Sequence, residues 1–288
     1  FKIEQACSIL KQGGAMLNVA MSFVRQSRLL LVVLLAFGFL PWHAQADSSR
    51  LERILADKKV RVCIWPDYYG ISYRNPKTQA LSGIDVDMAA ALGKDLGVNV
   101  EFVDSSFARL VADVTDERCD VAMFAIGINP QRLEKLRFTQ PHLASDIYAI
   151  TTRSNRRIQS WEDIDQPGSV VAVAKGTLHE PVMRQRLKAA ELRVLDTPQA
   201  REQEVESGRA DVFMTDFPFS TRMLETTDWA RLVKPSGIYH VTLYAYAMKL
   251  GDDSWHARME RFVAAVKQDG RLLEAARRHK LDPIVVLK

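Results

Sequence analysis

Short apolar runs alternate with segments of helical periodicity from residue 60 onward. Short runs rich in apolar residues predict strands at 60–64, 98–103 and 119–127. Apolar residues that recur every three or four positions predict helices at 85–97, 107–117 and 129–136. Asp85 and Gly97 are the expected caps of the first of these helices. Strands that alternate with helices predict an α/β fold with a parallel sheet covered by helices.

The same alternation begins again near residue 148. Further strands are predicted at 148–153, 169–175, 192–196 and 210–216, and further helices at 178–190, near 199–207 and from 217. The segment 239–249 is predicted to be extended, and helices follow it on either side of Gly270. The two halves share this organisation without a residue-level repeat.

The first part of the chain has the pattern of a secretory signal peptide. An apolar run at 29–40 follows Arg25 and Arg28 and precedes the sequence AQA at 44–46. We expect cleavage after Ala46 and an oxidising, periplasmic location. An uncleaved membrane anchor is the alternative, but the run is shorter than the roughly 20 residues of a spanning helix. Most of the formal net charge of +4 lies in this leader, and no basic stripe suited to nucleic acid follows it.

Metal and cofactor sites are not expected. The histidines after the leader have no partner at metal-ligand spacing. No Walker loop, dinucleotide-binding glycine motif or serine nucleophile elbow is present.

Cys63 and Cys119 are expected to be free, buried thiols. Cys63 lies near the end of one predicted strand, and Cys119 begins another. In neighbouring parallel strands these positions lie at opposite ends, farther apart than the roughly 7 Å between Cα atoms that a disulfide allows.

Candidate ligand contacts lie where strands turn into helices, because ligands bind at the carboxyl ends of parallel strands. In the turn at 125–132, Gly127 permits close approach of the backbone, and Asn129 and Pro130 favour a helix start. Arg132 then lies in the first helical turn, where the helix dipole disfavours a cation unless an anion is shared. A ligand carboxylate would be such an anion, whereas a solvent-facing arginine is the alternative.

Asp216 ends a second strand and precedes a helix. Its position suits an N-cap. Together with Arg132, it also suits a pair of opposite charges that would hold a zwitterion.

The third turn contains Thr177 and Glu180. Their spacing predicts a capping box, in which the threonine hydroxyl accepts from the Glu180 amide and the glutamate reaches back. A proton donor is the alternative role of Glu180.

Aromatic residues gather after the first two strands. Trp65, Tyr68 and Tyr69 form the cluster WPDYY, and Phe107 and Phe124 follow in later segments. So much aromatic surface in one loop indicates a binding partner.

These motifs together resemble the periplasmic amino-acid-binding proteins of ABC importers, solute-binding protein family 3. The resemblance rests on RVCIWPDYYGISYR, SGIDVDMAAALGKDLG, CDVAMFAIGINPQR, LRFTQPHL, AVAKGTLHE, GRADVFMTD and QDGRLLEAARRHKL in this order. It implies the two-lobed type II periplasmic-binding-protein fold, each lobe a mainly parallel sheet flanked by helices. It implies a first lobe made of 47–147 and 241–288, and a second made of 148–240.

The resemblance also implies roles for individual residues. Arg132 would hold the α-carboxylate of an amino acid and Asp216 its ammonium group. Tyr68 would stack on the ligand, and Thr177 would add a carboxylate contact. The expected ligand-binding residues are Trp65, Tyr68, Phe107, Phe124, Ala125, Gly127, Arg132, Thr177, Leu178 and Asp216.

Some positions depart from the family's pattern. Phe124, Ala125 and Gly127 lack the hydroxyl groups that family members often carry there. Trp65 stands where binders of basic amino acids carry an acid, so we expect a neutral or aromatic ligand side chain. The expected function is a monomeric receptor that delivers an amino acid or related carboxylate to a membrane permease.

The chain is also similar to an enzymatic branch, the cyclohexadienyl dehydratases. This likeness implies Glu180 as a general acid that protonates the leaving hydroxyl of prephenate or arogenate. Amino-acid binders commonly carry a glutamate at this point as well, so the dehydratase stays an alternative.

Overall fold

A computed structural model describes residues 49–288. The predicted leader, its cleavage point and Cys7 lie outside these residues. Among residues 49–288, no helix combines the length and the apolar character needed to cross a bilayer.

One mixed sheet has the strand order β5-β1-β6-β14-β7, and β8 also pairs with β14. Its strands are β1 (Lys59–Ile64), β5 (Asn99–Asp104), β6 (Val121–Gly127), β7 (Leu136–Phe138), β8 (Leu143–Ser145) and β14 (Thr242–Lys249). The neighbours β5, β1 and β6 are parallel as predicted, whereas β14 runs antiparallel to β6. The segment predicted as extended near 239–249 therefore returns from the second half of the chain to complete this sheet.

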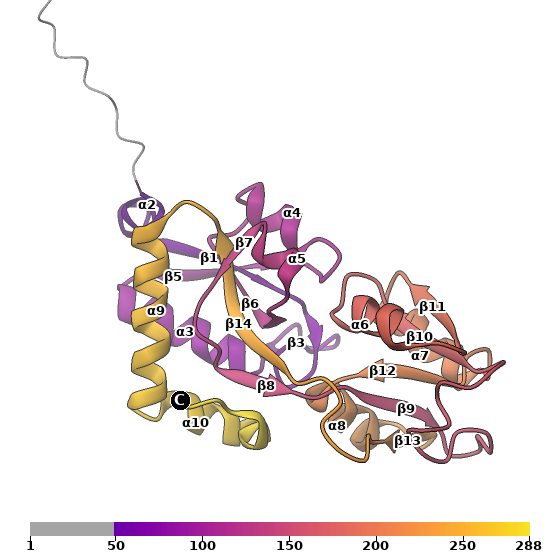
Figure 1. Ribbon diagram of the computed structural model, residues 1–288. Helices are drawn as coiled ribbons and strands as arrows, with labels where there is room; N and C mark the ends of the chain where they lie inside the picture. The colour runs from indigo at the N-terminus through magenta and orange to yellow at the C-terminus, as the bar shows by residue number, and fades with distance from the viewer. Residues whose placement is uncertain (1–48) are drawn as a thin grey trace, which may run out of the picture. The chain divides into compact units, whose positions relative to one another are not determined.

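Helices cover both faces of this first sheet. They are α2 (Arg50–Ala56), α3 (Ile84–Leu96), α4 (Leu110–Thr115), α5 (Pro130–Leu133), α9 (Asp253–Gln268) and α10 (Arg271–Arg278), with a short 3-10 helix at Asp282–Ile284. Figure 1 shows α3 and α4 on opposite sides of the sheet, with α9 and α10 beside α3. Gly97 ends α3 in the left-handed conformation, as predicted.

A second mixed sheet has the order β11-β10-β12-β9-β13. Its strands are β9 (Tyr148–Thr152), β10 (Val170–Ala174), β11 (Glu191–Leu195), β12 (Val212–Thr215) and β13 (Ala230–Val233). The helices α6 (His179–Arg186), α7 (Pro198–Glu206) and α8 (Phe217–Thr226) pack against it. The α/β class is thus confirmed, and each sheet contains a parallel part of three strands.

Two segments connect the sheets, one from β8 to β9 and one from β13 to β14. Asp146 in the first accepts hydrogen bonds from the backbone N–H groups of Tyr239 and His240 in the second, at 2.9 and 2.7 Å. This carboxylate ties the two crossing segments together. The lobe boundaries 47–147, 148–240 and 241–288 stay a prediction.

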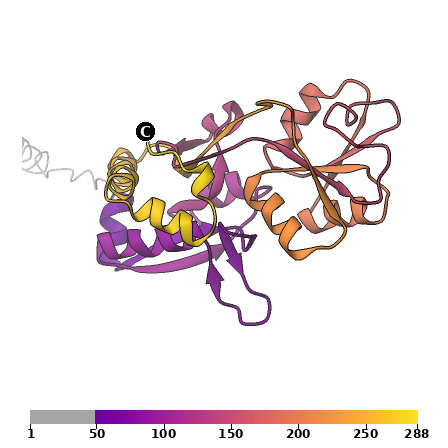
Figure 2. The ribbon, with the colours of Figure 1, turned by 90° about the horizontal axis from the view of Figure 1, so that it is seen from below.

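A small third sheet was not predicted. It consists of β2 (Asp67–Tyr68), β3 (Ser72–Arg74) and β4 (Leu81–Ser82). Figure 2 shows the hairpin, coloured indigo, projecting from the neighbouring helices. Strands of two or three residues are too short to show a clear alternation of apolar and polar residues in the sequence.

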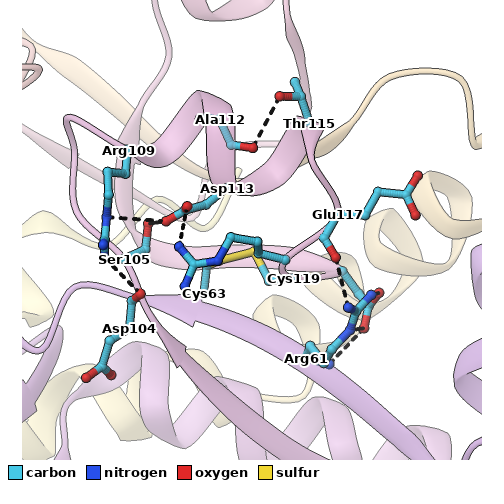
Figure 3. Close-up of a disulfide and its surroundings, with 12 residues drawn as sticks. Arg61, Cys63, Asp104, Ser105, Arg109, Ala112, Asp113, Thr115, Glu117 and Cys119 are labelled. Atoms are coloured by element: carbon cyan, nitrogen blue, oxygen red, sulfur yellow. Dashed lines mark hydrogen bonds and ion pairs between the residues drawn. A yellow bond between two sulfur atoms is a disulfide. The ribbon is translucent and has the colours of Figure 1, made fainter.

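The prediction of two free thiols is wrong, because Cys63 and Cys119 form a disulfide with a Cα–Cα distance of 5.5 Å. The strands are neighbours, but β6 begins opposite Val62, near the end of β1, instead of opposite its start. Cys119 lies just before β6, and the N–H of Asp120 donates to Arg61 O at 2.8 Å. Figure 3 shows the bridge beneath α4. Two ion pairs lie next to it, one between Arg61 and Asp120 and one between Arg118 and Asp113. Two free thiols would require β1 and β6 to pair in full register, and the sequence does not specify this register.

We predict that reducing this disulfide lowers the free energy of unfolding by about 4 kcal/mol, since its cysteines are 56 residues apart and the unfolded chain gains entropy when that loop opens. Thermal unfolding with and without reductant measures the change. In the variant with both Cys63→Ala and Cys119→Ala, the reductant should have no effect. Alkylation of both thiols in unreduced protein would contradict the disulfide.

Candidate functional site

A cavity lies between the two sheets. It contains about 470 Å³ of space that protein atoms do not fill, and this figure includes open solvent at its mouth. Its lining residues come from both sheets and from the turns at their strand ends: Trp65, Tyr68, Phe107, Ala125, Gly127, Arg132, Thr177, Leu178, His179, Pro198, Arg201, Thr215, Asp216, Phe219 and Tyr244. The structure therefore brings all the expected ligand-binding residues except Phe124 to one cavity. That they bind a ligand stays a prediction.

Arg132 is a buried cation on the wall of this cavity. Asn129 caps α5 and accepts from the backbone N–H of Arg132, as the sequence predicts for this turn. The side chain does not point to solvent, because only 6% of its surface is exposed. Its guanidinium donates to Gly127 O at 2.7 Å and, across the cavity, to Gly176 O at 2.9 Å.

No carboxylate of residues 49–288 forms a salt bridge with Arg132. Burial lowers its pKa to about 10, so the group remains charged at neutral pH. A guanidinium has five N–H donors, and the two carbonyls satisfy only part of them. The arrangement therefore suits an anion that enters the cavity.

Asp216 is the carboxylate of the cavity, and only 4% of it is exposed. It caps α8 by accepting from Phe219 N–H at 3.1 Å, so the N-cap prediction is confirmed. The hydroxyl of Tyr68, from the first sheet's side, donates to Asp216 Oδ2, and Tyr244 OH donates to the same oxygen at 2.9 Å. Burial raises the pKa of Asp216, whereas the hydrogen bonds from these donors lower it, and burial has the larger effect.

Aromatic rings form one wall of the cavity. Trp65 lies between Phe107 and Phe219, with ring centroids 5.4 and 6.5 Å away. Tyr68 packs against Trp65 at 5.0 Å. Phe124 does not reach the cavity, because it is fully buried behind Phe107 at 5.1 Å.

Two glycines allow the backbone to close around Arg132. Gly176 has a φ of 75°, and a Cβ there would lie 2.7 Å from the Cα of Ala108 in the opposite lobe. A Cβ on Gly127 would lie 2.7 Å from a methyl carbon of Thr242. Both positions therefore require glycine for close approach of neighbouring segments.

Ala125 also holds an unusual conformation, with a φ of 48°. Its N–H donates to the buried carboxylate of Asp85 at 2.9 Å, and Tyr246 OH donates to the other oxygen at 3.1 Å. Asp85 was predicted to cap α3, but Gly83 occupies the N-cap position. The carboxylate instead points into the core, where it fixes the strand that carries Ala125 and Gly127.

The predicted capping box at Thr177 and Glu180 is wrong. The helix begins at His179 with Leu178 as its N-cap, and no side chain caps it. Thr177 Oγ1 donates to Ala174 O at 2.6 Å instead of accepting from the Glu180 amide. Glu180 does reach back, but to Gly176 N–H at 3.1 Å, and it also pairs with Arg184 at 3.1 Å. Glu180 is not among the residues that line the cavity.

Several lining residues were not predicted from the sequence: His179, Pro198, Arg201, Thr215, Phe219 and Tyr244. His179 is half-buried with its Nδ1 enclosed, and burial of the imidazole lowers its pKa to about 3, so the imidazole is neutral. Its Nδ1 has no hydrogen-bond partner among residues 49–288. Within the same part of the chain, no group of three or more acidic, histidine or cysteine side chains is arranged to hold a metal ion.

Among curated proteins, the chain is 38% identical over 173 residues to a cyclohexadienyl dehydratase of Pseudomonas aeruginosa. This match covers 60% of the chain and 64% of the dehydratase, which is less than two thirds of that enzyme's length. The chain is 24% identical over 227 residues to the L-cystine-binding protein TcyJ of Escherichia coli, with 79% of the chain and 84% of TcyJ covered.

Solved structures with the same fold include amino-acid-binding proteins. The ancestral amino acid-binding protein AncCDT-1, described as a precursor of cyclohexadienyl dehydratase, superposes with a TM-score of 0.73 at 27% identity, covering 80% of this chain and 99% of that one. A cysteine-binding protein from Campylobacter jejuni superposes with a TM-score of 0.74 at 20% identity, covering 83% and 99%. These superpositions confirm the predicted type II periplasmic-binding-protein fold.

The model of the bacterial extracellular solute-binding proteins, family 3, matches residues 60–281, which are most of the described chain. The chain therefore belongs to this family of extracellular solute-binding proteins.

Proposed function

We propose that this protein is a periplasmic solute-binding protein that captures an amino acid or related small carboxylate between its lobes. The observation that carries the proposal is the buried guanidinium of Arg132, which lines the cavity without a carboxylate partner among residues 49–288. A ligand α-carboxylate offers two oxygens to this planar group and can bind it in a bidentate pair.

The ammonium group of an amino acid would bind Asp216. A carboxylate has about four acceptor positions, and here Tyr68 OH, Tyr244 OH and Phe219 N–H occupy three of them. One position remains for an ammonium hydrogen. A zwitterion would thus supply a negative group to Arg132 and a positive group to Asp216 without leaving either charge buried alone.

The same contacts support closure of the two lobes around a ligand. Arg132 donates to Gly176 O, which follows the second sheet's β10, and Tyr68 donates to Asp216, which follows β12. Both hydrogen bonds cross the cavity. A ligand that binds Arg132 and Asp216 at once therefore favours the closed arrangement over an open one.

Location and partners follow from the same proposal. A leader cleaved after Ala46 would deliver the protein to the periplasm. There it would act as a monomer that hands its ligand to the membrane permease of an ABC importer. Relatives named as binding proteins of amino-acid ABC transporters, such as one of Haemophilus influenzae that is 24% identical, support this role.

A cyclohexadienyl dehydratase is the second candidate, and the 38% identity to such an enzyme favours it. The geometry supports it less well. A general acid must reach the atom that it protonates. Glu180, the acid that the resemblance implies, binds Gly176 N–H and Arg184 and does not line the cavity.

We predict that Arg132→Ala removes about 2–5 kcal/mol of binding free energy, because the ligand carboxylate would be left buried without its partner. The probe is the amino acid, among the standard twenty, that raises the Tm of the wild type most. Titration calorimetry then measures its affinity for both proteins. Arg186→Ala is the control, since Arg186 is exposed, does not line the cavity and stacks on Tyr239. Unchanged affinity in Arg132→Ala would rule out the proposed clamp.

We predict no catalysed conversion of prephenate to phenylpyruvate, because Glu180 lies outside the cavity lining. Purified protein is incubated with prephenate, and product is followed by chromatography against a protein-free sample. Turnover that disappears in Glu180→Gln and persists in Arg184→Gln would replace the binding proposal with the dehydratase.

A further inference from the structure

A second buried arginine, Arg201, lines the same cavity. It belongs to α7 and is only 3% exposed. Its Nη1 donates to Met214 O at 2.8 Å, and its Nε has no hydrogen-bond partner among residues 49–288. No acidic side chain in that range forms a salt bridge with it. An unpartnered N–H in a buried cation is costly, so its retention needs a reason.

Aromatic packing explains part of this position. The guanidinium lies over the rings of Phe213 and Phe219, at 4.4 and 4.7 Å from their centroids. Burial lowers the pKa of Arg201 to about 10, so it too is charged at neutral pH. Asp216 and Glu202 act on it through space, but neither lies within ion-pair distance. Stacking satisfies the flat faces of the guanidinium and leaves hydrogen-bond donors at its edge.

The charges around the cavity do not balance for a simple zwitterion. Arg132 and Arg201 each contribute a positive charge, Asp216 contributes one negative charge at most, and the His179 imidazole is neutral. An amino acid with an uncharged side chain would pair with Arg132 and Asp216 and leave Arg201 unmatched. A second anionic group on the ligand would balance the site and supply an acceptor to Arg201.

We propose that the ligand is an amino acid with an anionic side chain, and that Arg201 binds its second carboxylate. This inference rests on the proposed function and narrows its ligand class. It also replaces the expectation from sequence of a neutral or aromatic side chain. Arg132, Asp216 and Arg201 would then hold the α-carboxylate, the ammonium and the side-chain carboxylate.

Wild-type protein gives the first test, because it requires no substitution. Titration calorimetry compares L-glutamate with L-glutamine, and L-aspartate with L-asparagine, as sodium salts at pH 7. Each pair has nearly the same shape and differs in one charge. We expect the acid of at least one pair to bind roughly 10- to 100-fold more tightly than its amide, the range of a charge-assisted hydrogen bond.

Other outcomes separate the two proposals. If an uncharged amino acid binds and the acids bind no better than their amides, the proposed function stands and the role of Arg201 is wrong. If none of the standard twenty amino acids binds, this inference fails, and the proposed function fails as well only if other small carboxylates also do not bind.

Arg201→Gln gives the second test. It should weaken binding of the acid about 10- to 100-fold and change binding of the amide less than about threefold. A purely structural role would weaken both ligands equally, and that result would overturn the proposal. Arg222→Gln is the matched control, because Arg222 lies over the same Phe219 ring at 5.4 Å but does not line the cavity. It should leave both affinities unchanged. If Arg201→Gln does not fold, the wild-type comparison still decides.

Discussion

The buried guanidinium of Arg132 is the constraint on which the site depends. A cation enclosed by protein is stable only if its donors find acceptors. Here the acceptors are the carbonyls of Gly127 and Gly176, one from each side of the cavity. Those carbonyls come close enough because neither residue has a Cβ, which would meet Thr242 at one position and Ala108 at the other. Arg132 and Gly176 thus join the two sides of the cavity, while Gly127 allows close packing against Thr242 of the neighbouring strand.

Asp216 imposes the complementary constraint. Its N-cap contact with Phe219 fixes one oxygen, and the hydroxyls of Tyr68 and Tyr244 fix the other. A carboxylate held in this way has a defined direction before any ligand arrives, so little entropy remains to be lost on binding. The structural role and the proposed ligand role are therefore compatible, since the cap is what positions the charge.

Short sequence patterns predicted the features of the fold and site that depend only on residues close together in the chain. The strand β6 and the cap of α5 followed from an apolar run and from Asn129 and Pro130, and Arg132 was recognised because a cation is out of place at a helix start. The capping box failed because α6 begins at His179, one position later than its spacing requires. A shift of one residue at a helix start is below what spacing can resolve.

Long-range contacts decided the features that were missed. The disulfide depends on the register of β1 against β6, which no single segment specifies. Arg201 lies in the polar segment PQAREQEVE, which reads as an exposed helix, and its burial requires Phe213 and Phe219 from later in the chain. Tyr244 lies in an apolar strand whose pairing with Gly127 brings its hydroxyl to Asp216.

The contacts of the aromatic wall change which ligand side chain these rings would favour. From sequence, Trp65 in the place of an acidic residue indicated a neutral or aromatic ligand side chain. In the structure Trp65 stacks parallel to Phe219, and Phe219 in turn lies against the Arg201 guanidinium. Rings in this position exclude water and lower the local dielectric, which strengthens the attraction between a buried cation and an anion. An apolar wall and a charged ligand are therefore compatible here, because the rings face the arginine that would bind the charge.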